Sequence, residues 1–504
     1  MDSALSRRFA RSLIVLVAIA VSLLSAEFVT RAIDGYDVWS IYLRRTREVS
    51  ARTTPDRQYL ASNLADGVNP SWYELTAPVP PGVPTDSAIA ARAAAPPIDP
   101  LWPYLWWNAA FIRQQVCGNL AGPPGALEDF YVFEPVDGRP FPRYRHLPHV
   151  TPPGWFTPNA FGWRGAEISA KRPTDTIRIA FVGSSTTVGN YGWPSSYPEV
   201  IGHWLNLWSE SQGRSLRFEV VNAARAGIEA KSIEAVVRTE VLSVDPDLIV
   251  YYEGANNFSP SWTLSMPAGT PPRPTSTFRQ RSRTENYSAI AGRVFDAILK
   301  SGHDGGEPLK PHFKFVWPKD VSESDPDVTR PDMLPIAMDE VVGGLDAIRR
   351  SIATTGAELA IASFVWLADD GMQLDLSRHL TLFRYLNETY WPLTYAHIHR
   401  MAAFENAVFR NYARTYSLAY VPMAESYPHD PDLFSDAIHF TERGMRLQAW
   451  ILLQHLIPIV DAHIRSRAWP KAPSGSVPSS GWTKAPQRLM TRSAMQASCP
   501  TTVH

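Results

Sequence analysis

Four short groups of residues carry the side chains that hydrolytic chemistry requires. Ser185 follows a glycine at a predicted strand-to-helix turn, and Asp436 stands three residues before His439. A serine hydroxyl becomes a nucleophile when an imidazole can accept its proton, and a carboxylate on the other ring nitrogen fixes the tautomer of that imidazole. Gly227 and Asn256 add a backbone N–H and a side-chain amide, which with the Ser185 N–H could stabilise an oxyanion. The combination predicts acyl transfer through Ser185, with His439 as the base.

Each of these signals has an ordinary structural interpretation when it is taken alone. A Gly-Ser pair is usually only a turn, and an asparagine after a strand often closes its own turn. An Asp-x-x-His pair is more often a helix cap beside a surface histidine. Their order along the chain favours a catalytic role over these structural interpretations, because all four groups follow strands of a single α/β pattern.

The elements that must position these residues alternate between strands and helices. Strands are predicted over residues 177–182, 218–221, 248–252, 358–366 and 418–421. Helices are predicted over residues 196–208, 231–242, 333–353, 396–416 and 441–464, the last with Thr441 as its N-cap. Apolar strands that alternate with helices indicate a parallel sheet covered on both faces, which is a three-layer α/β/α domain. Ligands bind at the carboxyl ends of such strands, where the four groups lie.

Together the four groups resemble the blocks of the SGNH (GDSL-type) hydrolases. The resemblance covers about residues 176–464, and the run Asp-Ala-Ile-His-Phe-Thr-Glu-Arg-Gly from Asp436 is its most specific part. It implies a flavodoxin-like fold with a mainly parallel five-stranded sheet. It also implies Ser185 as nucleophile, Asp436 and His439 as the other triad members, and an oxyanion hole of Ser185, Gly227 and Asn256.

Two departures from the family pattern accompany this resemblance. The family's Gly-Asp-Ser is Gly-Ser-Ser here, with Ser184 in the place of the Asp, and its Gly-x-Asn-Asp ends in Asn257. Neither replaced residue belongs to the triad, so activity is not excluded. The loss of charge at Asn257 is expected to alter loop geometry or substrate preference. Residues 159–165 also resemble a lead-in found before the nucleophile strand in membrane-anchored bacterial members.

The N-terminus carries a membrane signal. Arginines at positions 7, 8 and 11 precede an uncharged apolar run over residues 13–26, and apolar character resumes after Glu27 as far as Ile33. This length approaches the roughly 20 residues that span a bilayer. The basic flank favours a cytoplasmic N-terminus and an exported remainder, although Arg44, Arg45 and Arg47 weaken that orientation. A cleaved signal peptide and a buried soluble helix are the alternatives.

Composition narrows the class of protein. The chain has 504 residues, of which 45% are hydrophobic, and a net charge of −1, so neither general disorder nor a nucleic-acid-binding surface is indicated. Two cysteines exclude a disulfide scaffold and a four-cysteine zinc site. There is no phosphate-binding loop and no His-Glu-x-x-His motif, and the paired histidines at 146/149 and 397/399 lack ligand partners. No cofactor and no metal are expected.

Four regions follow from these patterns. They are a signal-anchor over residues 1–33, an irregular Pro/Trp-rich extracytoplasmic segment over 34–158, an α/β domain over 159–465 and a disordered tail over 466–504. The α/β domain is interrupted at about 258–332 by an insertion with an amphipathic helix predicted over residues 287–300. We expect this insertion to lie over one end of the sheet. Its basic cluster at 279–283 is interpreted as a solvated loop, with an anionic glycan or lipid headgroup as the alternative ligand.

The sequence thus predicts a membrane-anchored, extracytoplasmic serine ester hydrolase that works through an acyl-enzyme intermediate. One alternative is an O-acyltransferase that uses the same triad on a cell-envelope polysaccharide, so the substrate is an ester or an acylated glycan. The other is a non-catalytic envelope protein of the same fold. Beyond the membrane, protein partners cannot be assigned from these residues.

Overall fold

The computed structural model describes most of the α/β domain and the N-terminal helix. The described residues are 2–33, 38–39, 60, 64–78, 131–134, 143–146, 156–169, 171–190, 193–257, 287–299, 321–334, 338–372, 374, 376–391 and 393–472. They fall into two compact units. Helices α1 (Asp2–Ile33) and α10 (Ala289–Leu299) belong to the first unit, and the other elements belong to the second.

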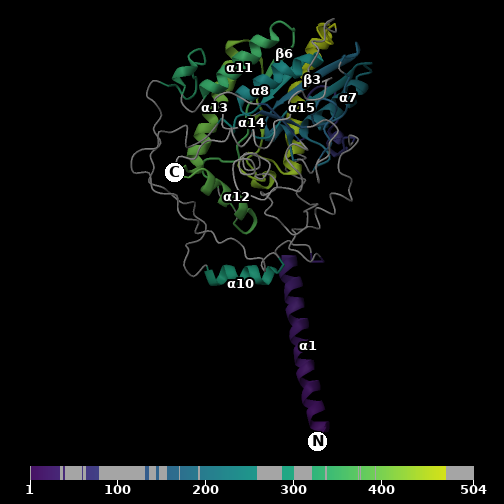
Figure 1. Cartoon of the computed structure of the whole chain (residues 1–504), viewed down its shortest axis with the longest axis vertical. Helices are drawn as coiled ribbons and strands as arrows, with labels where there is room; N and C mark the ends of the chain where they lie inside the picture. Colours follow the sequence, from purple (N-terminus) through teal and green to yellow (C-terminus); the bar gives the residue numbers. More distant parts are fainter. Residues whose placement is uncertain are drawn as a thin grey trace. The chain divides into compact units, whose positions relative to one another are not determined.

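The second unit is built around a parallel five-stranded sheet (Figure 1). Its strands are β3 (Thr176–Gly183), β4 (Arg217–Asn222), β5 (Leu248–Tyr252), β6 (Glu358–Ala362) and β7 (Ala419–Val421). They lie in the order β4-β3-β5-β6-β7, and every neighbouring pair is parallel. This is the flavodoxin-like order, in which the second strand along the chain lies outside the first. The predicted fold class is confirmed.

Helices cover both faces of the sheet. On one face α7 (Tyr197–Ser211) packs against α15 (Glu442–Arg465), and on the other α8 (Ala230–Thr239) and α13 (Tyr395–Thr415) both contact α11 (Met338–Ile352). Strands β3 and β5 are buried at every residue, as expected for strands covered on both sides. Thr441 is the N-cap of α15, and its side chain accepts from the N–H of Gly444 at 3.2 Å.

Smaller elements complete this unit. They are the strands β1 (Tyr131–Glu134) and β2 (Arg143–His146), the helices α6 (Ser185–Val188), α12 (Leu376–Thr389) and α14 (Met423–Ser426), and the 3₁₀ turns η1 (Pro70–Glu74), η3 (Val241–Val244), η6 (Pro331–Met333) and η7 (Pro431–Leu433). The sequence pattern did not predict α12. Part of the N-terminal segment packs on the domain, because the Trp204 and Trp208 indoles donate to the carbonyls of Trp72 and Asp66.

Several predicted elements have different bounds, and α7, predicted to end at residue 208, extends to Ser211. The strand predicted over 358–366 ends at Ala362, because the side chain of Asn406 takes both the N–H and the C=O of Phe364 at 2.7 and 2.9 Å. The helix predicted over 231–242 ends at Thr239 and is followed by η3. The helix predicted from 333 begins at Met338.

Several predictions lie mainly outside the described residues. These are most of the segment 34–158, the tail beyond residue 472, and the first part of the insertion with its basic cluster at 279–283. The start of the predicted tail is ordered, since the N–H of Lys471 donates to the Asp247 carboxylate at 3.0 Å. The domain boundaries otherwise stay a prediction.

Candidate active site

The structure brings Ser185, His439 and Asp436 together in a chain of hydrogen bonds. The Ser185 Oγ lies 2.9 Å from the His439 Nε2, and the His439 Nδ1 lies 2.5 Å from the Asp436 Oδ2. An ionised carboxylate only accepts, so Nδ1 carries the proton and Nε2 is left to accept from the serine hydroxyl. Two residues 254 positions apart in the sequence thus meet as donor and acceptor. This is the geometry that activates a serine nucleophile.

Close backbone packing holds the nucleophile at the carboxyl end of β3. A Cβ on Gly183 would lie 2.2 Å from the Tyr252 carbonyl oxygen and 2.4 Å from the Thr187 Oγ1, so only glycine fits there. The chain then turns directly into α6, which begins at Ser185. The N–H groups of Thr187 and Val188 both donate to the Ser184 carbonyl at 3.0 and 2.9 Å. The turn therefore fixes where the Ser185 side chain points.

The acid and the base share one tight loop between η7 and α15. Asp436 Oδ1 accepts from the N–H groups of Ile438 and His439 at 2.9 and 2.8 Å, while its other oxygen accepts from the imidazole. The Leu367 N–H donates to the Ala437 carbonyl at 2.8 Å and ties the loop to the segment that follows β6. Three hydrogen bonds to one carboxylate fix its orientation, which fixes the imidazole in turn.

Burial sets the protonation states of this pair. Asp436 has no exposed surface, and Ser185 and His439 are each 3% exposed. Burial raises the pKa of Asp436 to about 7, against the lowering effect of its two backbone hydrogen bonds. Burial lowers the pKa of His439 well below 6.5, which keeps the imidazole neutral and able to accept a proton at neutral pH. His439 is therefore suited to act as a general base.

Two of the predicted oxyanion donors converge on a single oxygen atom, the Ser184 Oγ. The Gly227 N–H donates to it at 3.1 Å and the Asn256 Nδ2 at 2.6 Å. Gly227 has a φ of +76°, a backbone conformation that favours glycine. The Ser184 hydroxyl thus occupies the position at which both donors point. Sequence reasoning treated Ser184 only as a replaced family residue, although its polar side chain beside the nucleophile was the available signal.

A buried carboxyl group orients the Asn256 amide. The Glu253 Oε1 accepts from the backbone N–H of Asn256 at 2.7 Å and from its side-chain nitrogen at 3.1 Å. Burial raises the pKa of Glu253 to about 8, and the nearby Glu405 carboxyl contributes to that rise. The next residue, Asn257, accepts from the Ala230 N–H at the start of α8 and donates to Glu340. Its carbonyl oxygen supplies the acceptor that the family's Asp could supply.

The lead-in over residues 159–165 supports the loop that follows the nucleophile. The Arg164 guanidinium donates to the carbonyl oxygens of Val188, Asn190 and Trp193 at 2.9, 2.8 and 2.7 Å. Asn159 Oδ1 accepts from two backbone N–H groups of its own turn and so holds the lead-in in shape. Arg164 is 2% exposed. The sequence alone did not indicate this positioning role.

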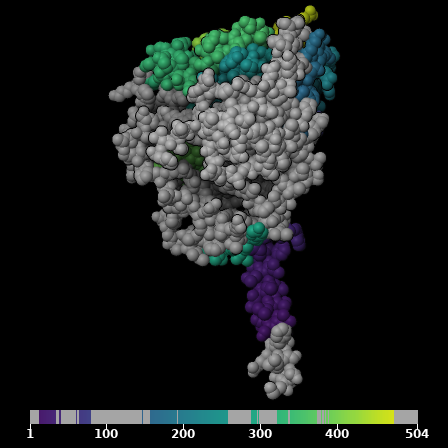
Figure 2. Space-filling view, viewed as in Figure 1, coloured from purple at the N-terminus to yellow at the C-terminus, as the bar shows by residue number. Residues whose placement is uncertain are grey.

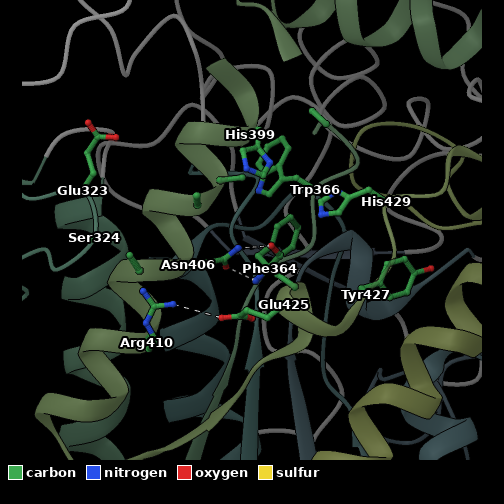
Figure 3. A pocket seen from close by; sticks show the side chains of 15 residues that line it. Glu323, Ser324, Phe364, Trp366, His399, Asn406, Arg410, Glu425, Tyr427 and His429 are labelled. Atoms are coloured by element: carbon green, nitrogen blue, oxygen red, sulfur yellow. Dashed lines mark hydrogen bonds and ion pairs between the residues drawn. The ribbon is translucent and has the colours of Figure 1, made fainter. Parts of the chain in front are cut away.

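A pocket of about 550 Å³ lies between α13, the segment after β6 and the segment around α14 (Figure 3). Phe364 and Trp366 from the segment after β6 form part of its wall, and α13 and the segment around α14 contribute polar groups. The Arg410 guanidinium faces the Glu425 carboxylate at 3.8 Å. The Tyr427 ring lies 4.6 Å from the Phe440 ring, which follows His439 directly. Tyr427, which lines the pocket, thus packs against the residue that follows His439, while Ser185, Asp436 and His439 are not among the lining residues.

No group of three metal-ligating side chains occurs among the residues that the structure describes. The His399 Nδ1 lies 3.1 Å from Asp369, and the His397 Nδ1 accepts from the Thr394 N–H as part of the cap of α13. These two histidines thus have structural partners.

Comparisons with known proteins give fold neighbours at low identity. No family model matches the chain, and no curated protein matches it. A GDSL-like lipase from Bacteroides thetaiotaomicron is 12% identical with a TM-score of 0.27, over 57% of this chain and 88% of its own. A lipase/acylhydrolase from Enterococcus faecalis is 13% identical with a TM-score of 0.30, over 56% and 96%. An acetylxylan esterase from Geobacillus stearothermophilus is 12% identical with a TM-score of 0.30, over 56% and 93%. Those activities belong to the neighbours.

Proposed function

We propose that this protein is a serine ester hydrolase with Ser185 as nucleophile, His439 as general base and Asp436 as the partner of the imidazole. The observation that carries the proposal is the continuous pair of hydrogen bonds, 2.9 Å from serine to imidazole and 2.5 Å from imidazole to carboxylate. If the Asp436–His439 pair served only as a helix cap beside a surface histidine, the imidazole would not need a buried serine hydroxyl at its Nε2.

The geometry supports a two-step reaction. The Ser185 Oγ attacks the ester carbonyl while its proton passes to the His439 Nε2, and Asp436 stabilises the imidazolium. The tetrahedral intermediate collapses as the C–O bond to the alcohol breaks, and the alcohol leaves with the proton from the imidazolium. Water then attacks the acyl-enzyme with His439 again as base, which releases the acid and restores the serine.

The developing negative charge requires donors that are already in place. The Gly227 N–H and the Asn256 amide converge on one oxygen position, and the Ser185 N–H is the third donor in this proposal. For these donors to reach the oxyanion, the Ser184 hydroxyl must give up their hydrogen bonds. The Glu253 carboxyl keeps the Asn256 amide in place during that exchange.

In this proposal the enzyme is held at a membrane with its catalytic domain on the extracytoplasmic side. Within the described residues α1 provides a candidate span, Ser12–Ile33, with none of its most apolar stretch buried. Figure 2 shows the described part of this helix in purple, and Leu16 and Val21 are 62% and 56% exposed. The basic residues before the span favour a cytoplasmic N-terminus.

Covalent labelling of the full-length protein tests the assignment. A fluorophosphonate probe should modify the wild-type protein at Ser185, and Ser185→Ala should abolish both labelling and turnover of a short acyl ester while the thermal transition is retained. The matched control Ser466→Ala changes an exposed serine at the end of α15 and should label normally. Absence of labelling in the wild type would leave a non-catalytic envelope protein. Labelling accompanied by an acylated glycan product, with no free acid, would instead indicate acyl transfer to a sugar hydroxyl.

A further inference from the structure

Helix α10 of the insertion begins on the side chain of a residue in the N-terminal helix. The Ala289 N–H donates to the Glu27 Oε1 at 2.8 Å, and the Ile290 N–H and the Ser288 hydroxyl donate to the Glu27 Oε2 at 3.1 and 2.8 Å. The first N–H groups of a helix have no partner within it, and a carboxylate is the charge that this end favours. Glu27 therefore caps a helix more than 250 residues away in the sequence.

A second residue of α1 completes the junction. The Arg31 Nε donates to the Glu27 Oε1 at 2.7 Å, and its guanidinium also donates to the Tyr287 carbonyl at 2.6 Å. The Arg31 and Glu27 side chains are only 8% and 16% exposed. Glu27 and Arg31 thus form a mostly buried ion pair, and both side chains also form hydrogen bonds to residues 287–290. Figure 1 shows α10 running sideways from the C-terminal end of α1.

The junction lies in the last two turns of the candidate span Ser12–Ile33. The run over residues 13–26 of α1 is uncharged, and Glu27 is the first charged residue after it. One position further, the Phe28 ring packs edge-on against Trp39 at 5.5 Å, and Trp39 is 85% exposed. Aromatic rings of this kind are enriched at the boundary between hydrocarbon and headgroups. Helix α10 therefore begins near the C-terminal end of the candidate span.

The sequence of α10 fits a helix that lies along such a boundary. From Ala289 to Leu299 the sequence of α10 is apolar apart from Gly292, Arg293 and Asp296. Ile290 and Val294 are one turn apart and share a face, and Arg293 lies about 100° around the helix from Val294. Val294 is 49% exposed in the first unit. A helix with a wide apolar face and a narrow charged face lies in the interfacial plane with its apolar side toward the acyl chains.

We propose that α10 is a membrane-surface helix that uses the lipid headgroup region as its partner, with Glu27 and Arg31 joining it to the anchor. The inference builds on the proposed membrane attachment and deepens it, because it requires α1 to be retained. A signal peptide removed near Ala26 would separate α10 from the span beneath it. The helix is linked through residues 258–286 to Asn257, next to the proposed oxyanion residue. The site is thereby tethered to the bilayer at two points of the chain.

Depth-dependent quenching on the full-length protein tests this inference. In a background of Cys117→Ser and Cys499→Ser, single cysteines from Val294→Cys or Arg293→Cys carry a fluorescent label. The proteins are reconstituted in vesicles of phosphatidylcholine and phosphatidylglycerol. Lipids brominated near the headgroup should quench the label at 294 at least about threefold more than the label at 293, and aqueous iodide should show the reverse order. Removing the cap with Glu27→Ala should reduce the lipid quenching at 294.

The outcomes separate this inference from the proposed function. Equal access of iodide to both labels would overturn it, and so would a label at 294 shielded from both quenchers, which would indicate a protein partner instead. A label at Ala462→Cys, on an exposed position of α15, should stay accessible to iodide throughout. Fluorophosphonate labelling of Ser185 in the same vesicles reports on the catalytic site independently of where α10 lies.

Discussion

The hydroxyl oxygen of Ser184 lies 2.6 Å from the side-chain nitrogen of Asn256, and the Gly227 N–H reaches the same oxygen at 3.1 Å. Ser184 precedes the proposed nucleophile and is fully buried. An oxygen atom that accepts from both donors occupies the place that a tetrahedral oxyanion requires. In the proposed mechanism, both donors are therefore held on the neutral Ser184 hydroxyl in the free protein, and the substrate must displace that hydroxyl.

Substitutions of Asn256 and Ser184 should have unequal effects on kcat. Asn256→Ala removes a donor and should lower kcat by about 10²- to 10³-fold. Ser184→Ala removes only the competing acceptor, so kcat should stay within about tenfold of wild type or rise. Steady-state hydrolysis of a short acyl ester by both variants measures the difference. An equal loss in the two variants would mean that the Ser184 O–H is itself the donor to the oxyanion.

The pH dependence of kcat/KM should have its acid limb near 7. Turnover requires an ionised Asp436 to accept the imidazole proton, and burial raises the pKa of that carboxyl to about 7. Activity should fall as the pH drops through this value, because the carboxyl becomes protonated. Asp436→Asn should remove the limb and cost on the order of 10⁴-fold in kcat. A limb centred near 4 in the wild type would contradict the burial effect on Asp436.

The buried carboxyl of Glu405, which lies next to Gly254, should make the folded protein less stable at high pH. Burial raises the pKa of Glu405 from 4.5 to about 8. Between these values the folded state binds more protons than the unfolded state, so stability is present below 4.5 and is lost as the pH rises toward 8. The Glu405 Oε2 accepts from the Trp366 indole at 2.9 Å, and its other oxygen has no hydrogen-bond partner among the residues that the structure describes.

Glu405→Gln imitates the protonated acid and should flatten this dependence by on the order of 1–3 kcal/mol between pH 5 and pH 8. Urea denaturation at several pH values measures the free energy of unfolding. The exposed change Glu210→Gln serves as the control and should leave the slope unaltered. Wild-type stability that rises across this range, with the same slope in Glu405→Gln, would show that Glu405 ionises freely in the folded protein.

We propose that the pocket between α13 and the segment after β6 holds the alcohol part of the substrate, because Tyr427 of its lining packs against Phe440, the residue after His439. Ala403 of α13 lines the pocket and is exposed, so Ala403→Trp fills the space without entering the core. We expect KM to rise by about tenfold for an acylated oligosaccharide and to stay constant for a small acetate ester. Ala462→Trp on α15 is the matched control. Unchanged KM for both substrates would remove the pocket from the binding site.

The alternation of strands and helices and the candidate catalytic residues follow from local patterns in the sequence. Apolar runs of strand length between amphipathic helices are local patterns, so β5 falls on the predicted residues and β3 and α13 within one residue of them. The Asp-x-x-His spacing is also local, because Asp436 and His439 share one loop. The apolar run before Glu27 likewise follows from composition along a short stretch. Such features arise from residues that are close together in the sequence, so they can be predicted from it.

The hydrogen bonds between side chains from remote segments became visible in the tertiary structure alone. The contact of Ser185 with His439 depends on the position of β3 inside the sheet. It also depends on the loop before α15, which brings His439 to the carboxyl end of β3. The early end of β6 depends on the Asn406 side chain from α13, and the capping of α10 depends on Glu27 from α1. Hydrogen bonds between remote segments leave no periodic signal in the sequence. Their partners are set by packing, in which each segment satisfies the polar groups of another.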